Sequence, residues 1–309
     1  MRPQKSQRSP TKNPKPVKKK SNHTSFEVRV RGMHYDPTFV SPRDREEVFT
    51  WLKTLNPIWE ERFSKNNPPP QGQPNRSLLR PVYWLGNWQF ACLDYYHPPQ
   101  GIENRCVRAE PYPKVLARWV FEIEQLVRNI YPAADIPQRW RLNTCLINFY
   151  GTRIDPITGK REDSARVGEH KDFEPGPVAS VSFGERALIQ FVSSSRIGTR
   201  DGVVFQQWLD DSALQIFGGS RWKRETFHRV QRVENKLKTL LPPQIENFET
   251  RRINFTFRYV PEEHIVRYCN LPAPQAEDVS QYMQQLGTHS SFFKEELDAR
   301  PGSSETLHL

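Results

Sequence analysis

From Leu142 to Val260 the sequence is a succession of short segments rich in apolar residues, separated by Gly, Asp and Ser. Short segments divided by turn-forming residues are typical of an all-β barrel or a double-sheet jelly roll. This pattern constrains the fold most, because two facing sheets are needed to bury the apolar sides of so many strands. We predict strands at residues 142–150, 178–183, 187–192, 203–209, 213–217, 228–230 and 252–260.

Two helices are predicted ahead of these strands. Ser41 and Pro42 form a helix start signal, because serine caps the first turn and proline fits its first position. This helix should run to about Leu55, and a second one is predicted at residues 115–130, where apolar residues recur at helical spacing. The order predicts a mostly β (α+β) fold, a double-stranded β-helix (jelly roll) buttressed by N-terminal helices.

The chain divides into three predicted parts. Residues 1–25 are rich in Lys, Pro and Ser and should form a disordered basic tail. Residues 26–262 should form the folded domain, beginning with a strand at 26–30. Residues 263–309 are predicted to be a polar C-terminal extension, partly disordered, with a short helix near 278–286.

Most of the positive charge lies in the basic tail. The chain has 45 basic and 35 acidic residues, a formal charge of +10, but the tail alone holds eight basic residues and no acid. The remainder therefore carries 37 − 35 = +2. Such a tail attracts polyanions, nucleic acid first among them, without sequence preference. A nuclear address or a solubilising arm would have the same composition.

Composition also indicates where the protein works. The sequence contains no run of 18 apolar residues, so we expect no membrane span, and the basic N-terminus lacks the apolar stretch of a secretory signal. The four cysteines are scattered without a CxxC pair, which favours reduced thiols and an intracellular location, in nucleus or cytoplasm. We expect a monomer.

His170 and Asp172 are the first residues that suggest chemistry. Residues two apart on a strand point to the same side, so both side chains could bind one metal ion. His228 would complete a two-histidine, one-carboxylate triad, which leaves three positions open on non-haem iron(II). The His-x-Asp pair alone would more readily indicate a solvated turn.

Residues 252–258 give a second pattern, since polar and apolar residues alternate there as in a strand. Arg252 and Arg258 share the polar face, and a guanidinium fork suits a carboxylate ligand. The same alternation would fit a polar outer face of a sheet. Upstream, Asn148 and Tyr150 also share one side of a predicted strand.

Together these segments resemble the AlkB family of 2-oxoglutarate- and iron(II)-dependent dioxygenases. The family pattern runs NxY, HxD, a distant His and RxNxxxR. This sequence supplies it as Asn148-Phe149-Tyr150, His170-Lys171-Asp172, His228 and Arg252-Ile253-Asn254-Phe255-Thr256-Phe257-Arg258. The resemblance is strong over residues 142–260 and faint over 31–90.

The resemblance implies a role for each motif residue. The iron ligands would be His170, Asp172 and His228. The 2-oxoglutarate ligands would be Asn148, Tyr150, Arg252, Asn254 and Arg258, with Arg252 on the distal carboxylate. With O2, such an enzyme oxidises an N-alkyl group of a DNA or RNA base, and the products are formaldehyde, succinate and CO2.

The expected substrate contacts are less well defined. Glu174 stands where relatives place an acid that accepts from a base amine, and Trp84, Tyr95 and Tyr96 offer rings on which a base could stack. Glu174 could instead be a surface carboxylate and the aromatic residues part of the core. The 19 residues between Tyr150 and His170 exceed the usual family spacing, and this insertion could read a substrate strand through Arg161 or be inert.

Three functions remain open on the sequence alone. The leading one is oxidative demethylation of nucleic-acid bases. The second keeps the chemistry but acts on a protein side chain or small molecule, which the nearly neutral charge beyond the tail favours. The third is a non-catalytic nucleic-acid-binding protein on the same fold.

Overall fold

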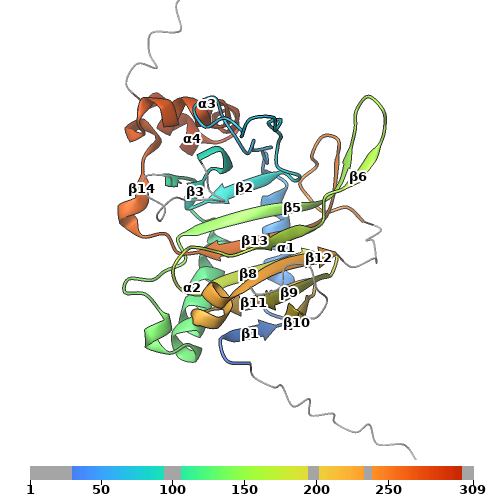
Figure 1. Ribbon diagram of the computed structural model, residues 1–309, viewed down its shortest axis with the longest axis vertical. Coiled ribbons are helices and arrows are strands. Elements are labelled where there is room, and N and C mark those ends of the chain that lie inside the picture. Colours follow the sequence, from blue (N-terminus) through green and yellow to red (C-terminus); the bar gives the residue numbers. More distant parts are fainter. Residues whose placement is uncertain (1–29, 94–105, 194–201, 233–238, 301–309) are drawn as a thin grey trace, which may run out of the picture.

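The computed structural model describes residues 30–93, 106–193, 202–232 and 239–300 (Figure 1). The predicted basic tail and nearly all of the strand predicted at 26–30 lie outside these residues. The strands are β1 (Met33–Asp36), β2 (Val82–Leu85), β3 (Asn87–Gln89), β4 (Cys106–Arg108), β5 (Thr144–Ile154), β6 (Arg161–Asp163), β7 (Val167–His170), β8 (Val178–Gly184), β9 (Ala187–Ser193), β10 (Val203–Leu209), β11 (Ala213–Phe217), β12 (Thr226–Arg232), β13 (Phe248–Arg258) and β14 (Ile265–Val266). The helices are α1 (Pro42–Leu52), α2 (Lys114–Ile130), α3 (Ala273–Gly287) and α4 (Ser291–Asp298).

Two antiparallel sheets form the predicted jelly roll. The large sheet has the order β1-β11-β8-β13-β5-β2, with β6 added beside β5. The small sheet has the order β10-β9-β12-β7. The sheets face each other through apolar side chains, as where the ring of Phe191 on β9 lies 5.2 Å from that of Phe217 on β11. A third, three-stranded sheet, β14-β4-β3, lies outside this pair.

The two predicted N-terminal helices are confirmed. Ser41 caps α1 by accepting a hydrogen bond from the backbone N–H of Asp44, at 3.1 Å. Both helices pack on the large sheet, since the ring of Phe49 lies 5.3 Å from that of Phe183 and the ring of Trp119 on α2 contacts Phe255. They therefore buttress the sheet that carries β5 and β13.

The C-terminal residues differ from the prediction of a polar extension. Instead of one short helix, α3 and α4 fold against one end of the domain (Figure 1), and Met283 and Phe293 are fully buried in its core. The ring of Phe293 on α4 lies 5.7 Å from that of Trp88 on β3, which is far earlier in the chain. The sequence did not indicate the apolar stripe of α3, because polar residues outnumber apolar ones in this helix. Residues 301–309 lie outside the described residues.

The insertion between Tyr150 and His170 forms an arm that projects from the sheets (Figure 1). β5 continues past the sheet and pairs with β6, with Thr152 opposite Asp163 and Ile154 opposite Arg161. Among the described residues, no helix is both long and apolar enough to cross a bilayer.

Candidate metal and co-substrate site

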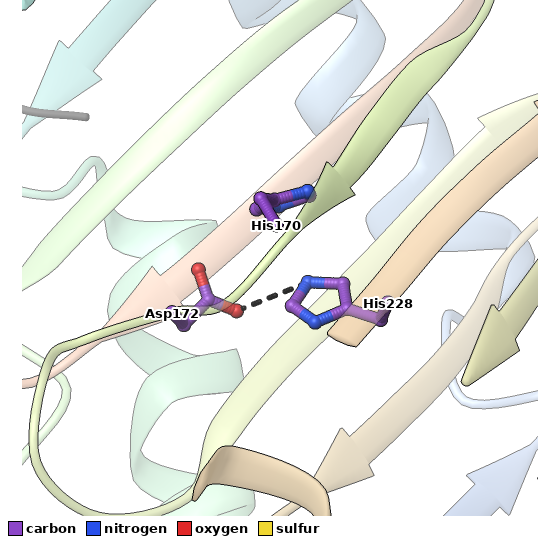
Figure 2. Close-up of side chains that lie close together, drawn as sticks. All are labelled: His170, Asp172 and His228. Atoms are coloured by element: carbon purple, nitrogen blue, oxygen red, sulfur yellow. Dashed lines mark ion pairs between the residues drawn. The ribbon is translucent and has the colours of Figure 1, made fainter. Parts of the chain in front are cut away.

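The three predicted metal ligands meet on the small sheet. β7 and β12 are antiparallel neighbours, and their register places His170 directly opposite His228, with ring centroids 4.2 Å apart. Asp172 follows the end of β7 and turns back, so that its Oδ2 lies 3.4 Å from Nε2 of His228 (Figure 2). One potential ligand atom from each residue lies within 4.8 Å of the other two.

Both histidines are held in the neutral form that binds a metal. Burial lowers the pKa of His228 to about 3 and also lowers the pKa of His170. Nδ1 of His170 lies 2.8 Å from the carbonyl oxygen of Gly168, which can only accept, so Nδ1 carries the proton and Nε2 is left for a metal.

Asp172 is kept ionised by a positive neighbour. Its side chain is buried, which alone would raise its pKa, but the positive charges around it, above all that of Arg258, outweigh burial and hold the pKa well below its usual range. Nε of Arg258 donates to Oδ1 at 2.8 Å, which leaves Oδ2 on the side of His228. Two neutral imidazoles and one carboxylate are the donor set that suits non-haem iron(II), so the residues present fit the metal.

A polar face on the large sheet lies across the same cavity. In the register of β5 and β13, Tyr150 stands opposite Arg252 and Asn148 opposite Asn254. The NxY and RxN motifs, about a hundred positions apart in the chain, are therefore cross-strand neighbours.

Arg252 has the geometry of a carboxylate receptor. Its guanidinium is buried, and Nη2 donates to Oγ of Ser182 at 3.1 Å and to Oδ1 of Asn254 at 3.0 Å. Within the part of the chain that the structure describes, Nε and Nη1 have no hydrogen-bond partner. Buried donors without a partner favour an incoming carboxylate, whose charge would offset the burial that lowers the pKa of Arg252.

The triad and the arginine face line one cavity of about 800 Å³. All eight residues predicted to bind iron or 2-oxoglutarate are on its wall. They are Asn148, Tyr150, His170, Asp172, His228, Arg252, Asn254 and Arg258.

Sequence reasoning missed several residues of this site. Ser180 and Ser182 on β8 both donate to Oδ1 of Asn254, at 2.8 and 2.9 Å, and thereby orient its amide. Their spacing of two along an otherwise apolar strand was a usable signal, because it puts both hydroxyls on one side. Arg80, which also lines the cavity, belongs to no motif and could be found only in the structure.

The expected role of Trp84 in stacking is wrong. Its side chain is only 2% exposed, its indole N–H donates to Oε1 of Glu60 at 2.7 Å, and it does not line the cavity. Trp84 is therefore a core residue held by a buried carboxylate. Tyr95 and Tyr96 lie outside the described residues.

Glu174 also differs from its expected position, whereas nothing in the structure tests the expected role of Arg161. Glu174 is 1% exposed, and its Oε1 lies 3.6 Å from Nε of Arg258, so it adds negative charge behind the metal site and does not line the cavity. Arg161 is an exposed residue of the arm, ion-paired with Glu249, and it too is absent from the cavity wall. The contact of Arg161 with a substrate strand therefore stays a prediction.

Comparison with known proteins agrees with this geometry. The model of the 2OG-Fe(II) oxygenase superfamily matches residues 32–258, from just before β1 to the end of β13. No curated protein matches the sequence.

Solved structures show low similarity. OsALKBH1 is 20% identical, over 74% of this chain and 99% of that chain, with a TM-score of 0.45. A prolyl-4-hydroxylase of Pseudomonas putida is 10% identical, over 75% and 94%, with a TM-score of 0.36. The Escherichia coli ribosomal oxygenase YcfD, in complex with cobalt and 2-oxoglutarate, is 11% identical, over 90% and 56%, with a TM-score of 0.31.

These likenesses select no substrate, whereas the family match spans the whole jelly roll and its cavity. The chain belongs to the 2OG-Fe(II) oxygenase superfamily, and it is an iron(II)- and 2-oxoglutarate-dependent dioxygenase.

Proposed function

We propose that this dioxygenase removes alkyl groups oxidatively from N-alkylated bases of DNA or RNA, as AlkB-like enzymes do. The observation that carries the proposal is the positive charge around the cavity. Arg62, Arg76 and Lys171 line it. Of the two acids that line it, Asp172 is assigned to the metal and Glu169 is ion-paired with Arg229 at 2.9 Å. A positive rim attracts the phosphates that flank a base.

The walls between the rim and the metal suit a planar, weakly polar group. Leu78, Phe173 and Phe227 line the cavity together with the rim cations, so an unstacked base would meet apolar and aromatic surfaces. A cavity of about 800 Å³ is large enough for a base that has left its stack.

The proposed reaction couples the oxidation of an alkyl group to the decarboxylation of 2-oxoglutarate. When bound, iron(II) activates O2 at the expense of 2-oxoglutarate, so that one oxygen atom enters succinate as CO2 leaves and the other enters a C–H bond of the alkyl group. On an N-methyl group this gives N–CH2OH, whose N–C bond then breaks to leave the base N–H and formaldehyde.

For this reaction, the residues of the chain would bind the metal and would bind and orient 2-oxoglutarate. We assign the metal to His170, Asp172 and His228. Arg252 would hold the distal carboxylate of 2-oxoglutarate through its buried guanidinium, which has donors without partners among the described residues. The polar side chains of Asn148, Tyr150, Asn254 and Arg258 complete the polar wall of the cavity.

The test is turnover with iron(II), 2-oxoglutarate, ascorbate and a panel of methylated DNA and RNA oligonucleotides. Mass spectrometry of the nucleosides should show loss of one class of methylated base, with formaldehyde and succinate formed in equal amounts. Succinate without demethylation of any oligonucleotide would overturn the substrate assignment.

A second candidate keeps the chemistry and changes the target to a protein side chain or small molecule. The charge of only +2 beyond residue 25 favours it, because duplex-binding proteins usually present a strongly basic face. Succinate formation stimulated by peptide or metabolite pools, and not by oligonucleotides, would support this candidate.

A further inference from the structure

Arg80 belongs to none of the sequence motifs, yet it contacts residues assigned to 2-oxoglutarate. It lies two residues before β2, and β2 pairs with β5 so that Val82 stands opposite Asn148. The segment 76–80 that precedes β2 lines the cavity throughout. Arg80 is thus the point at which this segment meets the residues assigned to 2-oxoglutarate.

Its first contact fixes the amide of Asn148. Nε of Arg80 donates to Oδ1 of Asn148 at 2.7 Å. A guanidinium can only donate, so the amide oxygen must face Arg80, and the amino group is the part of the amide left to donate into the cavity. Asn148 is 3% exposed and lines that cavity, so its orientation decides what a bound ligand meets.

Its second contact is with Tyr150. The guanidinium carbon of Arg80 lies 5.1 Å from the centre of the Tyr150 ring, and that of Arg252 lies 4.9 Å from it. Two guanidinium groups therefore pack on one phenol ring, where cation–π attraction offsets part of their mutual repulsion. A dianion in the cavity would offset the rest.

We propose that Arg80 is a positioning residue for 2-oxoglutarate, which acts by holding the Asn148 amide and the Tyr150 ring in their binding orientations. This inference rests on the proposed assignment of Asn148 and Tyr150 to the co-substrate. Arg80 gives the cavity-lining segment 76–80 a direct connection to the residues assigned to 2-oxoglutarate.

The experiment is a double-mutant cycle on the iron-loaded protein under anaerobic conditions, with 2-oxoglutarate affinity measured by calorimetry. Arg80→Met should weaken binding about tenfold, the usual worth of one charge-assisted hydrogen bond. Arg80→Lys should recover only part of the loss, because a lysine cannot reproduce the Nε donor and the flat stack. The double variant Arg80→Met, Asn148→Ala should lose less affinity than the sum of the two single losses, because each single change already removes the contact between Arg80 and Asn148.

Arg186→Met is the matched control. Arg186 packs at the same 5.1 Å on an aromatic ring, that of Trp208, but does not line the cavity. Its variant should bind 2-oxoglutarate like the wild type. With oxygen, Arg80→Met should raise the KM for 2-oxoglutarate and keep kcat within about twofold, which a general folding defect would not do.

Each of the following outcomes would overturn the inference. Wild-type affinity in Arg80→Met, or full recovery in Arg80→Lys, would show that its contacts do not position the ligand. Additive losses in the double variant would show that Arg80 does not act through Asn148. Wild-type affinity in Asn148→Ala, with weak binding in Arg252→Lys, would instead show that the assignment of Asn148 itself is wrong.

Discussion

His228 is assigned to the metal, and its imidazole is neutral because it is buried. His228→Ala should leave the protein without bound iron and reduce activity by about 100-fold or more, since only two of the three ligands remain. Metal analysis after desalting measures this directly. His264→Ala, on a turn outside the cavity, is the control and should retain iron. Equal iron in both variants would refute the triad.

Arg252 is predicted to recognise a carboxylate through its planar guanidinium group. Arg252→Lys should raise the KM for 2-oxoglutarate about tenfold or more, because an ammonium group is a point charge and cannot replace the fork. The dependence of succinate formation on 2-oxoglutarate concentration measures the change. Arg186→Lys should behave like the wild type, and an unchanged KM in Arg252→Lys would contradict the assignment.

Glu60 is a buried acid away from the metal whose protonation should affect stability. Burial raises its pKa from 4.5 to about 7, despite hydrogen bonds from Trp84, Trp88 and the backbone N–H of Ala91. The folded protein therefore binds this proton more tightly than the unfolded chain. The stability it contributes is fully present below pH 4.5 and is lost as the pH rises through about 7.

Glu60→Gln removes the titrating group and provides the comparison. The free energy of unfolding of the wild type, minus that of Glu60→Gln, should decrease between pH 5 and 8, as measured by urea titrations at each pH. The subtraction cancels the contribution of other groups, including His228, which acts in the opposite direction. A difference that does not change with pH would contradict the raised pKa.

Among the single residues of the site, the sequence predicted the positions of those that belong to a recognisable motif. The register of β7 with β12 then brought His170 and His228 together, as the triad required. The sequence could not predict the role of Arg80, because the contact of Arg80 with Asn148 depends on how β2 pairs with β5. It misassigned Trp84, because the buried partner Glu60 lies 24 positions earlier and no local pattern links them.

Among the secondary-structure elements, β5 and β13 determine most of the site. Their polar sides form one wall of the cavity, while the alternate residues, such as Phe255, face the helices. The alternation of polar and apolar residues made these strands predictable. The packing of α3 and α4 on the domain was not predictable, because it depends on distant contacts such as that of Phe293 with Trp88 on β3.

Phe293 tests whether α4 belongs to the domain. Its side chain is fully buried against Trp88, so Phe293→Ala should lower the free energy of unfolding by about 3–5 kcal/mol. Phe121 is 65% exposed on α2, and Phe121→Ala should change stability by no more than about 0.5 kcal/mol. Chemical denaturation monitored by tryptophan fluorescence compares the two, and equal effects would mean that α4 is only loosely attached.

For the molecule as a whole, charge is distributed unevenly, because removal of residues 1–25 reduces the formal charge from +10 to +2. A variant that lacks these residues should bind oligonucleotides more weakly at low salt, and its affinity should depend less steeply on salt concentration. Fluorescence anisotropy over a salt series measures both.

Succinate formation by the shortened protein should persist, since every residue assigned to iron and 2-oxoglutarate lies between Asn148 and Arg258. Unchanged affinity and salt dependence would place nucleic-acid binding, where present, entirely on the folded domain. Loss of succinate formation would mean that the first 25 residues support the catalytic domain itself.

The two histidines assigned to the metal belong to the small sheet and Arg252 to the large one, so a dicarboxylate anchored at both the metal and Arg252 would act as a removable crosslink between the two halves of the jelly roll. Ligand binding that links two elements favours the folded state by mass action. A simple melting experiment with metal and candidate dicarboxylates would therefore rank co-substrates and inhibitors before any substrate of the enzyme has been found.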